Sequence, residues 1–340
     1  MAGNAGAAAL ERAGAEAGRG GAEAGRGGAE GARGGASAFD EPLFVSVVIA
    51  GGMGAGLLVP GLANLLAPLL LPSLFLIVLG SLMPFRGVLA SAMFGFDRRA
   101  LAVVVWLQCA LPILVIAGGT VLDVPDYIMP FVLLSACSGA VFATPTLAGL
   151  FALDRAQAAR VMVLSTLLMP VSICVFLGPL IGLDNQGAFE IFGARVFLFL
   201  VVPAALILLY RAIESRGPAA MATLADRQAP RLGMCALSVF AIAIMAGVAE
   251  GFASDPGAIT SLFLGALCVN MGMLVITRFA LSALGTEVAH TASIVAMTRN
   301  VGLGYAMVGA FFGPELATYV ALCQVPLLVG PLIVRLRINS

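Results

Sequence analysis

Long apolar runs dominate the pattern of hydrophobic and polar positions from Leu43 onward. Each run has about 17–25 residues, the length that a helix needs to cross about 30 Å of hydrocarbon. Barrel strands would instead alternate apolar and polar positions over about ten residues. The pattern predicts an all-α polytopic membrane protein with ten transmembrane helices, at 43–60, 66–84, 100–120, 127–149, 158–181, 192–213, 232–251, 258–281, 287–312 and 316–336.

The composition agrees with a bilayer environment. Hydrophobic residues make up 61% of the 340 residues and charged residues 11%, whereas soluble domains carry about 25% charged residues. The 18 cationic residues are all Arg, 18 acidic residues balance them, and His290 is the single His. This composition excludes a soluble enzyme, a nucleic-acid binder with a basic face and a disulfide-stapled secreted domain.

The spans offer little catalytic chemistry. They contain no paired carboxylates, activated nucleophile or metal-ligand cluster, and a P-loop is impossible without Lys. We therefore expect no enzyme, no cofactor and no metal. The six cysteines stand singly within apolar runs, and we expect them to be small buried hydrophobic residues: Cys109, Cys137, Cys174, Cys235, Cys268 and Cys323.

Residues 1–40 differ from the rest of the chain. They repeat Gly, Ala, Glu and Arg with a period of seven, but the positions that a coiled coil needs to be apolar hold Gly or Ala. We interpret them as a disordered tail, and a start codon assigned too far upstream is an equal alternative. The transporter-like domain then covers 43–337.

The Arg residues are distributed asymmetrically between the two sides of the predicted membrane domain. Twelve lie on the even-numbered connections and the C-terminal end, and Arg195 alone lies on the other side. Because cationic residues are retained in the cytoplasm, both termini are expected to be cytoplasmic in a cell inner (plasma) membrane.

Ten spans divide into five plus five, and an odd number per half inverts the second half, as in many secondary transporters. The fourth span contains Gly139 and Pro145, and the ninth contains Gly302. Glycine and proline at matching positions predict that both helices are broken near the midplane.

Arg299, in the ninth span, is the most informative polar residue. A cation at this depth costs about 2.5–3.5 kcal/mol and requires a partner, yet no Asp or Glu lies deep within a span. Backbone carbonyls at a helix break, a polar cavity or an anionic substrate are the alternatives. Four further polar residues are predicted to share a cavity with it or to form single interhelical hydrogen bonds: Gln108, Asn270, Asn300 and Gln324.

The segment HTASIVAMTRNVGLGYAMVGAFFGP (290–314) resembles the ninth helix of the bile acid:sodium symporter family, and the stretch from Cys137 through LSTLLMP (164–170) resembles its fourth and fifth helices. The resemblance covers roughly 43–337. It implies a panel of helices 1, 2, 6 and 7, a core of helices 3–5 and 8–10, and alternating access of core against panel. It also implies that the broken helices 4 and 9 cross near the midplane.

The chain departs from that family at the implied sodium ligands. The ninth-helix Glu and Gln fall on Val295 and Arg299, and only Asn300 is kept. The Ser-Asn pair of the fourth helix falls on Thr144 and Pro145. The hydroxyl ligands of the fifth helix fall on Ala158 and Met162, and Gln108 is similar to a third-helix Gln.

Two hypotheses follow for Arg299. Its guanidinium stands where a sodium ion would and braces the helix crossing, or it binds a substrate carboxylate with Asn300 and the broken-helix N-termini. In either case we expect a secondary active transporter of a small organic solute, an anion, with the coupling ion unknown. The alternative is a membrane sensor or scaffold that keeps the fold. The expected partners are the substrate and the lipid bilayer, not nucleic acid.

Overall fold

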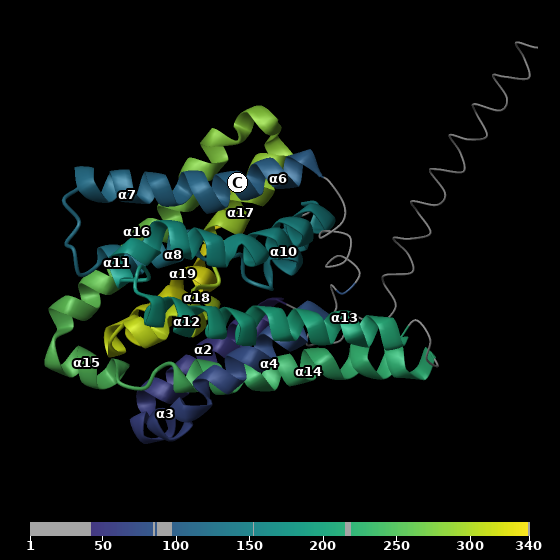
Figure 1. Cartoon of the computed structure of the whole chain (residues 1–340), viewed down its shortest axis with the longest axis horizontal. Helices are drawn as coiled ribbons and strands as arrows, with labels where there is room; N and C mark the ends of the chain where they lie inside the picture. Colours follow the sequence, from purple (N-terminus) through teal and green to yellow (C-terminus); the bar gives the residue numbers. More distant parts are fainter. Residues whose placement is uncertain (1–41, 84–85, 87–96, 152, 215–218, 339–340) are drawn as a thin grey trace, which may run out of the picture. The chain divides into compact units, whose positions relative to one another are not determined.

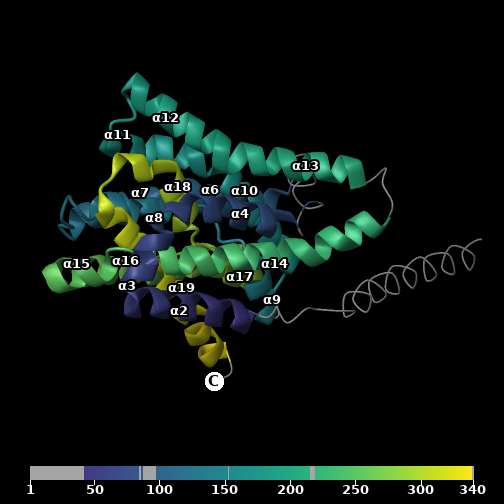
Figure 2. The ribbon, with the colours of Figure 1, turned by 90° about the horizontal axis from the view of Figure 1, so that it is seen from below.

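A computed structural model of the protein describes residues 42–83, 86, 97–151, 153–214 and 219–338. The predicted tail at 1–40 lies outside the described residues. The described residues form helices without a β-strand, and a single isolated bridge joins two non-helical segments. Figures 1 and 2 show the arrangement of the helices.

The first half of the chain contains twelve helical elements among the described residues. They are α2 (Pro42–Leu58), α3 (Pro60–Leu66), η2 (Ala67–Leu69), α4 (Leu70–Leu82), α6 (Arg98–Val105), η4 (Trp106–Ala110), α7 (Leu111–Val121), α8 (Met129–Cys137), α9 (Thr144–Leu150), α10 (Arg155–Ser172), η5 (Ile173–Leu177) and α11 (Gly178–Ile181).

The second half begins near residue 186 and contains two of the longest helices, α14 and α16. Its elements are α12 (Gln186–Val196), η6 (Phe197–Val201), α13 (Val202–Glu214), α14 (Ala219–Ala243), α15 (Val248–Ser254), α16 (Pro256–Ala280), η7 (Ser282–Leu284), α17 (Thr286–Met297), α18 (Val301–Val308), η8 (Gly309–Phe311) and α19 (Pro314–Ile338).

Six helical segments in the described part of the chain are long and apolar enough to cross a membrane, and one of them, Arg231–Ser254, contains a turn between α14 and α15. They are Pro60–Leu82, Arg98–Val121, Arg155–Ile181, Gln186–Glu214, Arg231–Ser254 and Pro256–Ala280. Each coincides with one of the predicted runs, as expected of a multi-pass membrane protein. Two other predicted runs, 127–149 and 287–312, are interrupted in the middle. The total of ten spans stays a prediction.

Three of these helices contain a π-helical turn, and each turn has the same cause. A proline stands two residues after each of η4, η5 and η6, at Pro112, Pro179 and Pro203. The proline ring would clash with the carbonyl four residues earlier in a regular α-helix. Widening the preceding turn to an i→i+5 pattern relieves this clash, and it frees carbonyl groups for other donors.

Three sets of helices pack most closely. α14 runs along α2 and α4, as Figure 2 shows for α2, while α16 packs against α17 and α19, and α10 against α6 and α9. In Figure 1, α2, α3, α4 and α14 lie in the lower part of the view, and α6, α7 and α10 in the upper part. The division into panel and core stays a prediction.

The run predicted at 232–251 coincides with the apolar segment Arg231–Ser254, although α14 itself begins at Ala219, because an apolar run marks the hydrocarbon-crossing part of a helix and not its end. One detail of the sequence analysis, the burial of all six cysteines, is wrong. All six cysteines are free, but only Cys137 and Cys323 are buried, whereas Cys109, Cys235 and Cys268 are exposed. An apolar outer surface suits a helix in lipid, so apolar surroundings in sequence do not imply burial.

Candidate functional site: a crossing of two broken helices

Two broken helices meet in the interior of the protein. α8 ends at Cys137 and α9 begins at Thr144, while α17 ends at Met297 and α18 begins at Val301. The two interruptions, 138–143 and 298–300, run past each other in opposite directions, and Ala140 pairs with Arg299 in an antiparallel bridge. The sequence prediction of breaks in these two segments, with a crossing between them, agrees with this geometry.

Each interruption satisfies backbone groups of the other. The N–H of Val141 donates to the carbonyl of Thr298 at 2.9 Å, and the N–H of Asn300 donates to the carbonyl of Gly139 at 2.8 Å. Non-helical backbone is tolerated at membrane depth only where such groups find partners within the protein. The crossing is therefore a paired unit, because neither break could be buried without the other.

Helix α10 supplies further acceptors to the crossing. The Oγ of Ser165 accepts a hydrogen bond from the N–H of Ala140 at 3.1 Å, and the Sδ of Met169 accepts one from the N–H of Gly139 at the same distance. The Cβ of an alanine at Gly139 would lie 2.8 Å from the Cα of Thr166. Only glycine therefore fits at position 139, where the first break packs against α10.

Two threonine hydroxyls also join the two breaks. The Oγ1 atoms of Thr144 and Thr298 lie 3.1 Å apart, within hydrogen-bonding distance, and both side chains are completely buried. Thr144 also donates to the carbonyl of Val141 and Thr298 to that of Ile294. Each hydroxyl has one proton, so a threonine that donates to the other threonine cannot also donate to its own backbone carbonyl. Either threonine can be this donor, which gives two alternative arrangements of the hydrogen bonds.

Arg299 is buried at the crossing, with 3% of its surface exposed. Its Nη1 donates to the carbonyl of Ser138 at 2.9 Å and its Nη2 to the carbonyl of Leu107 at 3.0 Å. The buried polar side chains of the described residues include no Asp or Glu. Ser138 follows the C-terminal end of α8, where the helix dipole is negative. The cation is therefore solvated by backbone carbonyls, one of the three alternatives left open by the sequence.

The carbonyl of Leu107 is available because of Pro112. Within η4 the N–H of Leu111 bonds to the carbonyl of Trp106, five residues earlier. The next bond in this pattern would join residue 112 to Leu107, but proline has no N–H to donate. The π turn and the proline together leave a bare carbonyl on the third predicted span, and the Nη2 of Arg299 uses it.

Gln108 lies beside Arg299 and shares its acceptor. Its Nε2 donates to the same carbonyl oxygen of Ser138, at 3.2 Å, and its backbone carbonyl accepts a bond from the Oγ of Ser172 at 2.9 Å. Gln108 is 3% exposed. Within the described residues, two buried atoms of this pair have no hydrogen-bond partner: Gln108 Oε1 and Arg299 Nε.

The other predicted cavity residues form hydrogen bonds with backbone groups of their own helices. The Oδ1 of Asn300 caps α18 by accepting from the N–H of Leu303 at 3.1 Å. Asn270 and Gln324 each donate to a carbonyl four residues earlier, at 2.7 and 3.2 Å. Asn270 is buried, whereas Asn300 and Gln324 are half-buried. A cavity shared by Asn270, Gln324 and Arg299 stays a prediction.

The predicted helix-breaking residues are placed differently around the two interruptions. Gly139 lies within the first break, whereas Pro145 and Gly302 lie in the first turns of α9 and α18. A Cβ at Gly302 would lie 3.3 Å from side-chain atoms of both Leu74 and Phe240. Gly302 is therefore a position of close approach between α18 and the helices α4 and α14.

Three of the positions that the family resemblance assigns to sodium ligands are apolar and buried. Val295, Ala158 and Met162 are completely buried. In the part of the chain that the structure describes, no group of three His, Cys, Asp or Glu side chains could hold a metal ion. The oxygen atoms near the crossing come from backbone carbonyls, from the hydroxyls of Ser and Thr residues and from the side-chain amides of Gln108 and Asn300.

The sequence analysis missed three residues of the crossing: Leu107, Ser138 and Thr298. Pro112, five residues after Leu107, was the available signal for a free carbonyl. Arg195 was predicted to lie on the side opposite the other Arg residues, and its side stays a prediction. It lies in α12, and its Nη1 donates to the carbonyl of Ala306 in the last turn of α18 at 3.0 Å.

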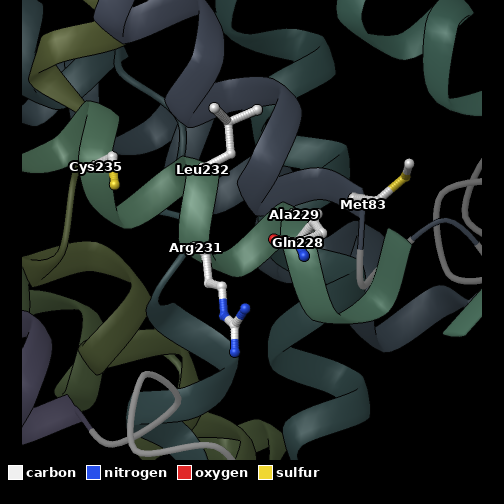
Figure 3. A pocket seen from close by; sticks show the side chains of 6 residues that line it. All are labelled: Met83, Gln228, Ala229, Arg231, Leu232 and Cys235. Carbon is white, nitrogen blue, oxygen red and sulfur yellow. The ribbon is translucent and has the colours of Figure 1, made fainter. Parts of the chain in front are cut away.

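A separate cavity of about 430 Å³ lies on α14 beside the end of α4 (Figure 3). Its lining includes none of the predicted site residues. The lining residues are Met83, Gln228, Ala229, Arg231, Leu232 and Cys235.

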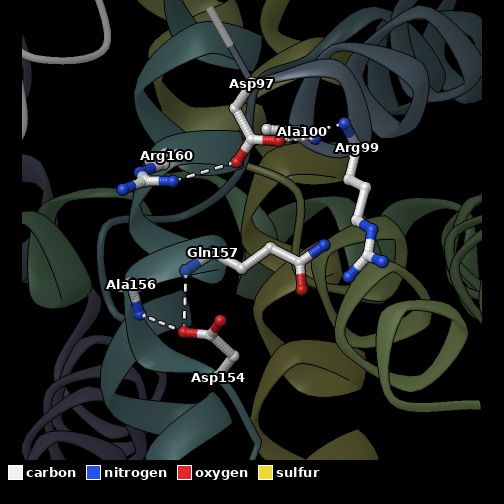
Figure 4. Close-up of polar contacts among 7 residues, drawn as sticks. All are labelled: Asp97, Arg99, Ala100, Asp154, Ala156, Gln157 and Arg160. Atoms are coloured by element: carbon white, nitrogen blue, oxygen red, sulfur yellow. Dashed lines mark hydrogen bonds and ion pairs between the residues drawn. The ribbon is translucent and has the colours of Figure 1, made fainter. Parts of the chain in front are cut away.

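Two aspartates, Asp97 and Asp154, cap the first turns of α6 and α10, the helices that contain the start of the third and fifth predicted spans (Figure 4). Asp97 accepts from the N–H groups of Arg99 and Ala100, and its other oxygen binds Nη1 of Arg160 at 3.0 Å. Asp154 caps α10 in the same way. The Ala100 N–H and the Arg160 guanidinium lower the pKa of Asp97 although burial raises it. This cluster fixes the start of α6 against α10.

Two comparisons with known proteins found no match. No protein-family model matches the chain, and no characterised protein sequence matches it.

Proposed function

We propose that the protein is a secondary active transporter, which moves a small organic anion across the cell inner membrane by alternating access. The observation that carries this proposal is the crossing of two broken helices with a buried Arg299 between them. Broken helices in secondary transporters form the substrate and ion sites near the midplane. The mutual hydrogen bonds of the two breaks are consistent with such a site.

The proposal includes a complete membrane topology. It has ten spans in two inverted halves, with a core that moves against a panel and both termini in the cytoplasm. The six long apolar helices and the asymmetric distribution of Arg support it. The sequence resemblance makes the protein a divergent member of the bile acid:sodium symporter family under this proposal.

Arg299 stands in for a coupling cation in this mechanism. Backbone carbonyl oxygens are ligands that hard cations use, and the Arg299 guanidinium occupies two of them. A sodium ion about 4 Å away would be repelled by about 4 kcal/mol at an effective dielectric constant of 20. The crossing is held together by a cation that cannot leave, so transport does not require sodium.

A thermal-shift screen of the purified protein tests this proposal. The ligands are bile acids, keto acids, pantoate-like acids and oxyanions, each added as the sodium and as the choline salt. We expect an organic anion to raise the melting temperature equally with both cations, and to be taken up by proteoliposomes in choline medium. Uptake that strictly requires sodium would refute the role given to Arg299.

A sensor or scaffold with the same fold is the second candidate. The apolar residues at the implied sodium-ligand positions favour this candidate, because a protein that no longer transports does not need sodium ligands. The two candidates differ in one measurement: a sensor binds the anion in the thermal-shift screen, but proteoliposomes that contain it accumulate none.

A further inference from the structure

Gln108 and Arg299 form a pair of buried head groups that meet at one atom. The Nε2 of Gln108 and the Nη1 of Arg299 both donate to the carbonyl oxygen of Ser138, at 3.2 and 2.9 Å. Both side chains are 3% exposed. Each retains one polar atom that has no partner among the described residues, a donor on Arg299 (Nε–H) and an acceptor on Gln108 (Oε1).

The assignment of the Gln108 amide is fixed by its neighbour. If the amide were reversed, Oε1 would face the carbonyl oxygen of Ser138, and two acceptors would lie against each other. The free atom of Gln108 is therefore the oxygen. Leaving a buried donor and a buried acceptor unpaired is costly, because both lose their hydrogen bonds to water.

The charge of Arg299 adds a second requirement. The two carbonyls on its Nη atoms are neutral, and the buried side chains of the described residues include no carboxylate. A water molecule would satisfy both atoms but would leave the charge of Arg299 unbalanced. A group that also balances this charge carries a negative oxygen for the Nε–H and an O–H donor for Oε1. A plain carboxylate meets only the first need, and the ammonium group of an amino acid would be repelled by the guanidinium.

We propose that Arg299 Nε and Gln108 Oε1 form the recognition point for an organic anion with a hydroxyl beside its carboxylate, a 2-hydroxycarboxylate. The carboxylate accepts from Nε–H, and the hydroxyl donates to Oε1. The two Nη atoms keep bracing the crossing, so one guanidinium serves both purposes. This inference rests on the proposed transport function, because both atoms are shielded from solvent and ligand entry requires the crossing to open.

Matched pairs of anions test the role of the hydroxyl. Glycolate is compared with acetate, and lactate with propionate, all as choline salts. The full-length protein is studied in detergent by its melting temperature and by the fluorescence of Trp106. Trp106 is the only Trp in the chain and stands two residues before Gln108. We expect each hydroxy acid to bind about tenfold more tightly than its partner, the effect of one well-formed buried hydrogen bond.

Two variants at Gln108 separate recognition from folding. Gln108→Leu should bind all four anions with the affinity of acetate or propionate, because the acceptor for the hydroxyl is gone. Gln108→Glu should bind none of them, because its carboxylate pairs with Arg299, and it should melt no lower than the wild type. The control is Gln186→Leu, a substitution of the same kind at an exposed residue whose side chain bonds to Glu190 of its own helix. It should keep the tenfold preference.

Three results would overturn the inference: equal binding within each pair, a preference that survives Gln108→Leu, or no binding of any of the four anions. The last result would mean that the pair holds water only. Uptake by proteoliposomes separates this inference from the transport function. Hydroxyl-selective binding without uptake rejects transport and retains the site, whereas sodium-independent uptake of an anion that shows no hydroxyl preference rejects the site and retains transport.

Discussion

Gly139→Ala tests whether the first helix break is packed against α10 as the structure describes. The added Cβ would lie 2.8 Å from the Cα of Thr166, 3.0 Å from its Oγ1 and 3.1 Å from its backbone nitrogen. Two of these three atoms belong to the backbone of a long helix, so a rotamer change cannot relieve the contact. Overpacking of this kind costs about 1–3 kcal/mol. Gly139 does not have a positive φ, so the whole effect is steric.

Gly272→Ala is the matched control. Gly272 lies within α16, and a Cβ there would meet no atom within 4 Å. Replacing a helical glycine with alanine stabilises by about 1 kcal/mol. The two substitutions are chemically identical, and the structure predicts opposite signs for them.

Thermal unfolding in one detergent, followed by far-UV circular dichroism, measures both variants. We expect Gly139→Ala to melt below the wild type and Gly272→Ala at or above it. If Gly139→Ala melts at the wild-type temperature or higher, the crossing does not lie against α10 at the described distance, and the geometry around Arg299 is wrong with it.

Two further predictions concern hydrogen bonds at and near the crossing. Thr298→Val should lower the free energy of unfolding by about 1 kcal/mol, because it removes the link to Thr144; Thr260→Val, at an exposed hydroxyl bonded to its own helix, should change it less, and an equal loss would contradict the link. Asp97→Ala should cost about 1 kcal/mol through the lost cap of α6. Because the pKa of Asp97 is lowered in the folded protein, its contribution is present above the pKa of the unfolded chain and is lost as the pH falls through the folded pKa. The stability of Asp97→Ala should therefore fall less on acidification to about pH 3, and an unchanged pH profile would refute this role.

The long helices could be predicted from the sequence because their cause is local. A run of about 20 apolar residues is expelled from water whatever it packs against, so Pro256–Ala280 and its five counterparts coincide with predicted runs. The helix ends could not be predicted in the same way. α14 continues through polar residues to Ala219, since a helix that leaves the hydrocarbon loses its apolar signal but keeps its hydrogen bonds.

The candidate site could be predicted in part. Gly139, Pro145 and Gly302 are residue types that interrupt membrane helices, and they indicated where the two breaks would lie. Leu107 and Thr298 gave no such signal, because their roles depend on a backbone carbonyl and on a hydroxyl that meets a residue 154 positions away. Asn270 and Gln324 show the converse: a polar side chain in an apolar run predicts a hydrogen bond, but not its direction.

The sequence by itself determined that the chain is helical and apolar enough for a membrane, and that one cation, Arg299, lies deep among apolar residues without an acid nearby. Hydrophobic length and charge are properties of the chain, so these conclusions needed no coordinates. Only the tertiary structure decided what Arg299 touches. Its partners are the carbonyls of Leu107 and Ser138, and every residue has a carbonyl. Which carbonyls are left without a donor depends on where a π turn, a proline and two helix ends meet in space.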